Sequence, residues 1–482
     1  MLFNSIEFTL FLPIVFSLYW LLANKSLKLQ NFFLIIASYV FYGWWDWRFL
    51  SLIAFSSLVD YSVGIGFSKT DNKAKRKLLL LASVLVNLGF LGFFKYFNFF
   101  VESFAATFTF FGQPISDPSL LSIVLPVGIS FYTFQTLSYS IDLYRQKLEP
   151  TRDIVAFFAF VSFFPQLVAG PIERATNLLP QFQKERTFEY GKAVDGIRQI
   201  LWGLFKKIVI ADNCAVYVDF VFSSYADYSY SGSTLLLGVV FFAFQIYCDF
   251  SGYSDIAIGT SRLFGFNLMR NFAFPYFSRD IAEFWRRWHI SLSTWFRDYV
   301  YIPLGGSRGG TWRTIRNIIV TFLVSGLWHG ANWTFVVWGA LNAIYFLPLV
   351  LMNKNRRNTD TVAAKRLLPS IKDAIQIGIT FFMTSIAWVF FRAETVGQAV
   401  SYISRMFSAS LFSIPEVLPD TPIMLLIATF VFSEWLQRSQ QHTLQFDEIA
   451  IPQTFRWAIY NGVILTLLLF GGRPQEFIYF QF

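Results

Sequence analysis

Residues 78–98 read LLLLASVLVNLGFLGFFKYFN, and Lys95 is the only charged side chain among them. About 20 mainly apolar residues are enough for a helix to cross the hydrocarbon core of a bilayer, so this stretch predicts a membrane-spanning helix. Similar stretches recur near 7–23, 30–47, 50–66, 121–141, 153–170, 197–222, 233–261, 317–351, 373–391, 421–437 and 456–471. Together they predict an all-α, polytopic membrane bundle of about ten to twelve transmembrane helices.

The composition fits a bilayer better than water. Of the 482 residues, 55% are hydrophobic and 20% are aromatic, whereas only 14% are charged. Lipid-facing and interfacial positions accept this many aromatic side chains, but a water-soluble surface does not. The net charge of +9 comes from Lys and Arg that lie mostly between the apolar stretches, where they orient loops and meet anionic headgroups. We therefore expect membrane lipid as a partner and no nucleic acid.

We expect residues 1–482 to form a single transmembrane domain, because no linker or soluble domain separates the apolar stretches. The most basic loops, 69–77 and 354–372, are placed in the cytoplasm by the positive-inside rule, which puts both termini outside. The loop 99–120 and the segment 393–420 are then expected to be external.

Two of the apolar stretches are imperfect spans. Stretch 153–170 contains Pro165, and stretch 317–351 is long and is interrupted at Gly326–Gly330. Segment 270–316 is rich in Arg and should face the cytoplasm, although counting every stretch as one crossing puts it outside. We therefore expect 153–170 not to span the bilayer fully, and we expect broken or re-entrant helices at both places.

The segment SGLWHGANW, residues 325–333, contains the histidine of greatest interest, His329. An imidazole can accept and return a proton near neutral pH, and an ionisable side chain within a membrane is a functional-site hypothesis by default. Trp328 and Trp333 could wall an acyl chain away from water, with Asn332 beside them. The structural alternative, in which His329 only bonds a neighbouring helix, stays open from the sequence.

A second histidine, His289, lies in EFWRRWHISLSTWFRDY, residues 283–299. At helical spacing His289 shares a face with Trp285 and Trp288, and Glu283 lies one turn from the arginines that follow it. This pattern predicts an amphipathic interfacial helix with a basic edge. The helix could simply anchor the chain through Trp and Arg, or its arginines could receive the phosphate groups of a cytosolic donor.

Other polar residues have simpler interpretations. Asp249 is a costly charge at membrane depth, so we expect an ion pair or hydrogen-bond network there rather than direct catalysis. His442 follows a polar run and is predicted to be a solvated loop residue. Cys214 and Cys248 show no metal-ligand spacing, so we expect buried thiols and no metal site.

Three motifs, FWRRWHISLS at 284–293, RDY at 297–299 and LWHG at 327–330, resemble the membrane-bound O-acyltransferase (MBOAT) family. The closest likeness is to its bacterial alginate O-acetyltransferase-like branch. Further likenesses are FPQLVAGPI at 164–172, DFSGYSD at 249–255 and FIYF at 477–480, so the resemblance covers essentially the whole chain.

The resemblance implies a helical bundle around a central tunnel in the bacterial cytoplasmic (inner) membrane. It also implies that acetyl-CoA serves as the cytosolic acyl donor, without a tightly bound cofactor, and that a separate extracytoplasmic esterase-like partner completes transfer to a polysaccharide acceptor. His329 and His289 match the family's catalytic positions. We expect donor contacts from Arg286, Arg287, Trp285 and Arg297, and further site residues at Asp298, Asn332, Trp333 and Asp249.

Other functions stay open at this point. Acetylation of peptidoglycan and D-alanylation of teichoic acid use related motifs, and transfer could be direct or pass through a histidyl-acyl intermediate. A transporter could use Asp249, His289 and His329 as a proton relay, and a scaffold protein would need its histidines only for structure.

Overall fold

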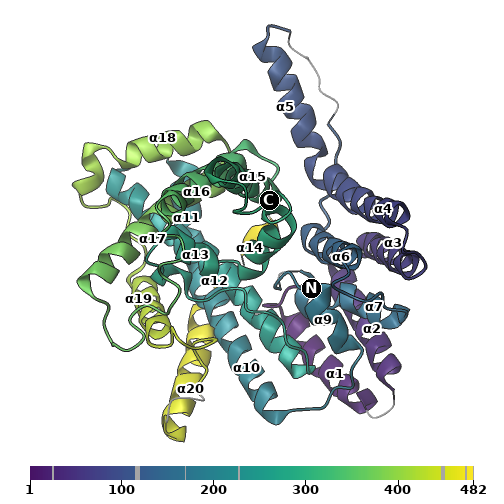
Figure 1. Ribbon diagram of the computed structural model, residues 1–482. Coiled ribbons are helices and arrows are strands. Elements are labelled where there is room, and N and C mark those ends of the chain that lie inside the picture. Colours follow the sequence, from purple (N-terminus) through teal and green to yellow (C-terminus); the bar gives the residue numbers. More distant parts are fainter. Residues whose placement is uncertain are drawn as a thin grey trace. The chain divides into compact units, whose positions relative to one another are not determined.

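The computed structural model of the chain describes residues 1–23, 26–113, 120–168, 170–225, 228–446, 451–472 and 475–480. Within these ranges the chain is helical and contains no β-strand, which confirms the all-α prediction (Figure 1). Two compact units can be distinguished. Unit 1 consists of Met1–Ala193 and Thr260–Met269, and unit 2 consists of Val194–Gly259 and Arg270–Phe482.

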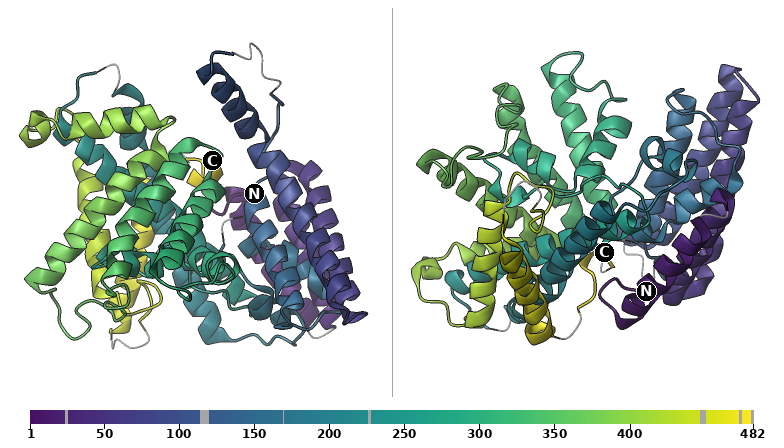
Figure 2. Two further views of the ribbon diagram at one scale, coloured as in Figure 1. Left: turned by 45° about the horizontal axis from the view of Figure 1, so that its top comes forward. Right: turned by 90° about the horizontal axis from the view of Figure 1, so that it is seen from below.

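Unit 1 is built from apolar helices whose interior is rich in aromatic side chains. The Tyr19 hydroxyl donates to the carbonyl of Phe264 at 2.8 Å, which ties segment 260–269 to the first helix. The helices of this unit are α1 (Ile6–Ala23), α2 (Leu27–Asp46), α3 (Leu50–Ser68), α4 (Lys73–Leu91), α5 (Phe97–Phe110), α6 (Ile129–Tyr144), α7 (Ile154–Ser162), α8 (Phe164–Leu167) and α9 (Ala175–Phe182). Helices α3, α4 and α6 pack against one another, and α2 packs against α1 and α7 (Figure 2).

Unit 2 contains the longest helix and the two predicted histidine motifs. Its elements are α10 (Tyr190–Leu204), the π-helix η3 (Phe205–Ala211), α11 (Asp212–Ser224), α12 (Gly232–Leu263), α13 (Ile281–Arg287), α14 (Ile290–Phe296), the π-helix η5 (Arg297–Tyr301), α15 (Thr311–His329), α16 (Trp333–Leu351), α17 (Ile371–Arg392), α18 (Val396–Met406), α19 (Thr421–Leu436) and α20 (Gln453–Phe470). The first four residues of α10 and the last four of α12 belong to unit 1. Helix α16 packs against α15 on one side and against α17 on another.

Most of the apolar stretches coincide with helices, and the two imperfect spans are indeed broken. The prediction for stretch 121–141 was wrong at its start, because residues 121–128, which include Pro126, are not helical and α6 begins only at Ile129. Stretch 153–170 contains α7, of nine residues, and α8, of four, with a break at Phe163, so neither piece is long enough to cross a bilayer alone. Stretch 317–351 ends one helix at His329 and begins another at Trp333.

Both segments that the sequence analysis expected to be external contain a helix. The supposed loop 99–120 begins with α5, which continues α4 through a short π-helical turn at Gly92–Tyr96. No proline interrupts this apolar run, so the helix continues beyond the 20 residues that a span requires. Segment 393–420 likewise contains α18, whose start is capped by the Thr395 side chain.

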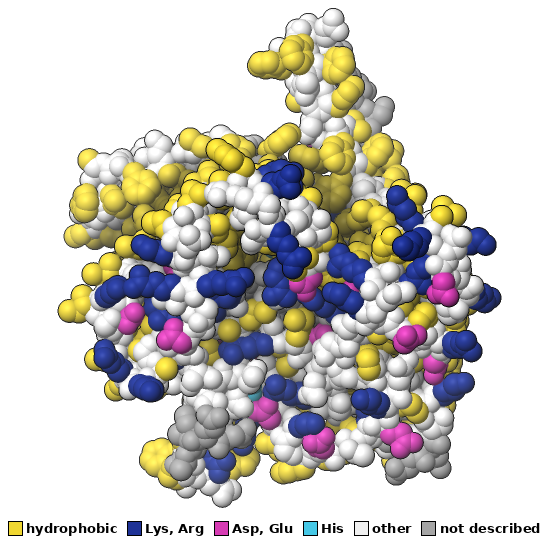
Figure 3. Space-filling view, in the orientation of Figure 1, with side chains coloured by type: hydrophobic (Ala, Val, Ile, Leu, Met, Phe, Trp, Pro, Cys, Tyr) yellow, Lys and Arg dark blue, Asp and Glu magenta, His cyan; other side chains and the backbone are white. Residues whose placement is uncertain are grey.

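Many large apolar side chains lie on the surface of the helices. Five helical stretches are long and apolar enough to cross a membrane, namely Leu27–Ser68, Lys73–Phe110, Gly232–Leu263, Trp333–Leu351 and Ile371–Arg392. Exposed leucine, isoleucine and phenylalanine side chains lie on four of them and on the shorter apolar helices, whereas Gly232–Leu263 is mostly buried. Such exposure is costly in water but favourable in lipid. On the face of unit 2 seen in Figure 3, Lys and Arg gather over the region of α13 and α17 beside these apolar side chains. The chain is therefore an integral membrane protein.

Close contact between α15 and α16 depends on two glycines. A Cβ atom at Gly326 would collide with the carbonyl oxygen of Phe335, and one at Gly339 would collide with the carbonyl oxygen of Phe322. The two backbones thus touch where α15 approaches its end. This contact fixes the position of His329, three residues after Gly326.

Replacing Gly326 with alanine should therefore destabilise the protein by about 1–3 kcal/mol, the usual cost of overpacking a tight contact. Thermal unfolding of the purified protein in detergent measures this loss. The matched control is Gly378→Ala in α17, because no atom lies within 4 Å of the added Cβ. That control should unfold no earlier than the wild type, since alanine favours helix over glycine. Equal melting of the two variants would contradict the packing argument.

Candidate active site

The helix predicted through residues 283–299 is interrupted at His289, so the expected shared face of Trp285, Trp288 and His289 is wrong. Trp288 is extended (φ −98°, ψ 127°), and His289 adopts the left-handed conformation (φ 43°, ψ 55°) between α13 and α14. Tertiary bonds from Asn271 replace the helical ones. Its carbonyl accepts the N–H of Ile290 at 2.8 Å, and its side chain accepts the Ser291 hydroxyl at 2.9 Å. Helical periodicity cannot reveal such a distant partner.

His329 lies at the end of α15 inside a cage of aromatic rings and is only 3% exposed. The centroid of its ring lies 5.0 Å from that of Trp328, 5.0 Å from that of Trp338 and 5.3 Å from that of Phe391. The ring of His289 lies at 6.3 Å. The structure therefore brings together the two histidines that the sequence singled out, although 39 positions separate them.

His289 is completely buried and lies outside the candidate membrane spans. Its ring meets the edge of Phe250 at a centroid distance of 4.6 Å, and neither ring nitrogen has a hydrogen-bond partner among the described residues. Burial lowers the pKa of the His289 imidazole to about 3, because water no longer solvates the charged form. At neutral pH this imidazole is uncharged, so one nitrogen can donate a hydrogen bond and the other can accept one.

Asp249 has the ion-pair partner that the sequence analysis expected. Its Oδ1 lies 2.9 Å from Lys207 Nζ, and its Oδ2 accepts the N–H of Ile478 at 2.7 Å. Lys207 also pairs with Asp212 at 2.7 Å and donates to the carbonyl of Gln475 at 3.0 Å. This buried ion cluster therefore holds the C-terminal segment 475–480 against α12 and η3.

The anchored C-terminal segment supplies a side chain that the sequence analysis did not assign to the site. The Tyr479 ring lies 5.7 Å from that of His329 and 6.4 Å from that of His289. Phe477, fully buried, packs against Tyr253, with the two tilted rings at a centroid distance of 4.4 Å. The only hint in the sequence was the family likeness of FIYF, because no spacing rule connects residue 479 with residue 329.

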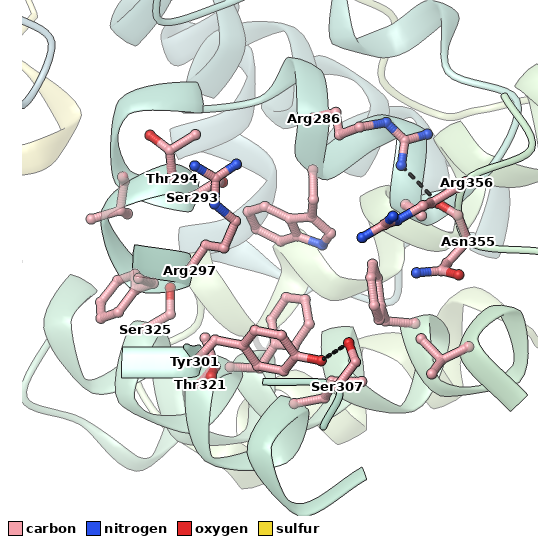
Figure 4. A pocket seen from close by; sticks show the side chains of 18 of the residues that line it. Arg286, Ser293, Thr294, Arg297, Tyr301, Ser307, Thr321, Ser325, Asn355 and Arg356 are labelled. Atoms are coloured by element: carbon pink, nitrogen blue, oxygen red, sulfur yellow. Dashed lines mark hydrogen bonds between the residues drawn. The ribbon is translucent and has the colours of Figure 1, made fainter. Parts of the chain in front are cut away.

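Unit 2 contains a pocket of about 510 Å³, lined among others by Ile290, which follows His289, and by Ser325, one turn before His329 (Figure 4). Three of the four expected donor contacts line it: Trp285, Arg286 and Arg297. Arg287 is absent from its lining, because its guanidinium pairs with the buried Glu283 at 2.9 Å. Arg356, which the sequence analysis did not single out, lies near Arg286 at one end of the pocket.

The arginine side chains of the pocket differ in the hydrogen bonds and ion pairs that they already form with other residues. Arg286 donates to the carbonyls of Asn355 at 2.8 Å and Asn358 at 2.6 Å, in the loop between α16 and α17. Arg297 pairs with Asp298 at 2.7 Å. No hydrogen bond or ion pair joins the exposed Arg356 to another described residue. Arg356 is therefore the pocket cation most available to an anionic ligand.

Only one layer of aromatic rings separates the pocket from His329. Trp285, in the pocket wall, lies 5.7 Å from Trp338, and Trp338 in turn touches the His329 ring. Ser325 also lines the pocket and precedes His329 by four residues, about 6 Å along an α-helix. A chain-like ligand that lies in the pocket with its anionic end at the arginines can thus extend towards the histidine cage.

The other residues that the sequence analysis singled out, Asn332, Trp333 and His442, each have a different environment. Asn332 caps α16 by accepting the N–H of Thr334, and its amide donates to the carbonyl of Glu394 at 2.8 Å. Trp333 is 56% exposed, so it does not close the cage around His329. His442 is buried rather than solvated, and its Nε2 lies 2.9 Å from Asp195. The prediction for His442 was therefore wrong, because a polar run can fold inward when a buried side chain finds an acidic partner.

The fold and the site define an integral membrane protein with two buried imidazoles near the aromatic wall of a basic pocket. Residues 150–391 match the model of the membrane-bound O-acyltransferase (MBOAT) family, a range that includes both histidines and the whole pocket. The chain belongs to this family, and it is an O-acyltransferase.

Relatives confirm both the family and the branch. The chain is 42% identical over 421 residues to the probable alginate O-acetylase AlgI of Pseudomonas aeruginosa, covering 86% of this chain and 77% of that protein. It is 35% identical over 493 residues to the peptidoglycan O-acetyltransferase of Helicobacter pylori, covering 96% and 88%. It is 29% identical over 246 residues to the teichoic acid D-alanyltransferase of Bacillus subtilis, covering 48% and 60%.

Proposed function

We propose that this O-acyltransferase moves acetyl groups from acetyl-CoA towards hydroxyls of an exported, alginate-like polysaccharide, with His329 as the general base. The observation that carries the proposal is the position of His329, buried in an aromatic cage one ring layer from a basic pocket. The names of the 39–42% identical alginate O-acetylases support this acceptor. Peptidoglycan is the second candidate, since the Helicobacter pylori relative matches 96% of the chain.

The basic pocket is the proposed site for acetyl-CoA. Arg356 and Arg286 would contact its phosphates, because guanidinium groups donate charge-assisted hydrogen bonds to phosphate oxygens. The apolar wall around Trp285 and Phe322 would cover the pantetheine arm and exclude water. A pocket of about 510 Å³ lies within the range of small-ligand sites. The basic loop 354–372 borders it, in keeping with donor entry from the cytoplasm.

The two histidines would take different parts in transfer. His329 accepts the proton of the acceptor hydroxyl as its oxygen attacks the thioester carbonyl. The neutral His289 can donate a hydrogen bond to the oxyanion that forms, since its nitrogens have no partner among the described residues. When the intermediate collapses, the C–S bond breaks, and the proton on His329 passes to the departing CoA thiolate. The products are an acetyl ester and CoA. In a variant of this scheme, a histidine carries the acetyl group covalently between the two steps.

A separate extracytoplasmic partner with an esterase-like fold would complete delivery to the polymer. We place the whole system in the bacterial cytoplasmic (inner) membrane, where a cytosolic thioester and an exported polymer lie on opposite sides. The membrane nature of the family and the apolar helices support this location.

The proposal is tested by supplying the purified protein in lipid vesicles with acetyl-CoA labelled on the acetyl group, with short alginate oligomers, and with an extracytoplasmic extract of the same cells that provides the proposed partner. We expect release of CoA that matches the label found on the oligomers. A transporter would instead accumulate substrate inside the vesicles without any release of CoA. That result would replace the acyltransfer proposal with the proton-relay alternative.

Replacing Arg356 with glutamine should raise the KM for acetyl-CoA about tenfold and leave kcat nearly unchanged, because one charge-assisted hydrogen bond is worth roughly 1.5 kcal/mol. Steady-state rates of CoA release at varied acetyl-CoA measure both constants. The matched control is Arg357→Gln, which removes an adjacent exposed charge that does not line the pocket. If both variants had the same KM, Arg356 would have no specific contact with the donor.

A further inference from the structure

The described residues that line the pocket proposed for the donor do not include His289 or His329, so part of the pocket wall lies between the thioester and its base. Trp285 is a wall residue whose ring contacts the cage. Its centroid lies 5.7 Å from that of Trp338, and the Trp338 centroid lies 5.0 Å from that of His329. An acyl group that moves from the pocket to His329 therefore passes beside these two tryptophan rings.

The two tryptophans differ in how tightly other rings enclose them. Trp338 is only 1% exposed, and it is stacked on Trp388 at 5.6 Å and packed against Phe391 at 5.5 Å. Trp285 is half-buried, and its ring meets that of Phe322 at 5.5 Å but also borders the pocket. Trp285 is thus the side of the Trp285–Trp338 contact that a substitution can shorten without removing a ring in direct contact with His329.

Trp285 also carries an unused hydrogen-bond donor. Its indole Nε1 is buried and has no acceptor among the described residues. A buried donor without an acceptor is destabilising, and a ligand with a carbonyl oxygen can offset that cost when it binds. Acetyl-CoA has such oxygens in its thioester and in the amides of its pantetheine arm. The indole N–H is therefore suited to hold the end of the donor that carries the acyl group.

We propose that Trp285 determines the length of the acyl group that this protein transfers, and restricts it to acetyl. The inference rests on the proposed acetyl transfer. The indole N–H holds a carbonyl of the donor, and the ring leaves space beside Trp338 for a two-carbon group. A longer chain would have to enter the contact between the two rings, and an interior packed this closely does not accept extra methylene groups without strain.

The test compares acetyl-CoA with butyryl-CoA as donors in the vesicle assay described above, with kcat/KM measured for each. The wild type should use butyryl-CoA about a hundredfold less efficiently, because each of its two extra methylene groups is rejected by about tenfold. Trp285→Ala should reduce this difference to about tenfold or less. Trp285→Phe keeps a ring but loses the N–H, so it should keep most of the preference while the KM of both donors rises about two- to tenfold.

Phe346→Ala is the matched control. Phe346 is another half-buried aromatic residue of the pocket wall, but it follows Trp338 by eight residues, about 12 Å along α16. Its loss widens the pocket away from the Trp285–Trp338 contact, so both donors should be affected alike and the preference for acetyl should stay that of the wild type.

The ratio of the two kcat/KM values does not depend on the amount of folded protein, so a loss of stability cannot imitate the expected change. If Trp285→Ala does not accumulate in the membrane, Trp285→Leu takes its place, with a preference at least fivefold weaker than that of the wild type. An unchanged preference in either variant, or a wild type that uses both donors equally well, would overturn the proposed selectivity. An unchanged KM in Trp285→Phe would overturn the hydrogen bond to the donor. A wild type that releases no CoA from acetyl-CoA would overturn the proposed function, and this inference with it.

Discussion

Replacing His329 with alanine is expected to lower kcat for acetyl transfer by about a hundredfold to ten-thousandfold, the usual contribution of a positioned general base. The acceptor hydroxyl would then lose its proton acceptor, whereas the basic pocket proposed for the donor lies beyond the layer of Trp285 and Trp338. The KM for acetyl-CoA should therefore change little. Initial rates of label transfer from acetyl-CoA, normalised to folded protein, measure both constants.

The matched control is His442→Ala. His442 is also a buried histidine, only 2% exposed, but its partner is Asp195 and it belongs neither to the cage nor to the pocket. This variant loses an imidazole of the same kind without touching the proposed chemistry, so its kcat per folded molecule should equal that of the wild type. Equal losses of kcat in the two variants would contradict a specific catalytic role for His329.

Replacing Lys207 with methionine should destabilise the protein by about 3–5 kcal/mol, because it leaves two buried carboxylates, Asp212 and Asp249, without their cation. The same change removes the hydrogen bond to the carbonyl of Gln475. The C-terminal segment that places Tyr479 beside His329 would then be held less firmly, so we expect lower transfer activity even in the fraction that stays folded.

Thermal unfolding in detergent and transfer activity measure the two effects of Lys207→Met. Lys192→Met is the control, since Lys192 and Glu189 form an ion pair whose side chains are about half exposed. Such surface pairs contribute roughly 0–1 kcal/mol, so this control should unfold close to the wild type. If Lys207→Met unfolded at the same temperature as the control, the buried ion cluster would not be what anchors the C-terminal segment.

The membrane bundle could be predicted from the sequence because its cause is local. A run of about 20 apolar residues satisfies its own backbone hydrogen bonds as a helix, whatever its neighbours are. Proline and glycine also act locally, by interrupting a helix. Pro165 and the glycines around His329 therefore predicted the broken spans at 153–170 and 317–351. The exact number of crossings, the tunnel and the orientation stay predictions.

Parts of the site could not be predicted because they depend on distant partners. The left-handed turn at His289 is stabilised by Asn271, which no helical spacing links to it. Glu283 was expected near both arginines that follow it, yet it pairs with Arg287 and leaves Arg286 to the carbonyls of a loop about 70 residues further along. Tyr479 joins the site only because Lys207 and Asp249 bind the segment that carries it.

The most direct test of the acyltransferase account is the amount of polymer-bound acetate in cells that carry His329→Ala at the membrane abundance of the wild type. The proposed chemistry predicts that acetate on the exported polysaccharide falls to the level of cells without the protein. Cells that carry His442→Ala should keep the wild-type amount. Undiminished acetylation in the His329→Ala cells would contradict the assignment of His329 as the catalytic base.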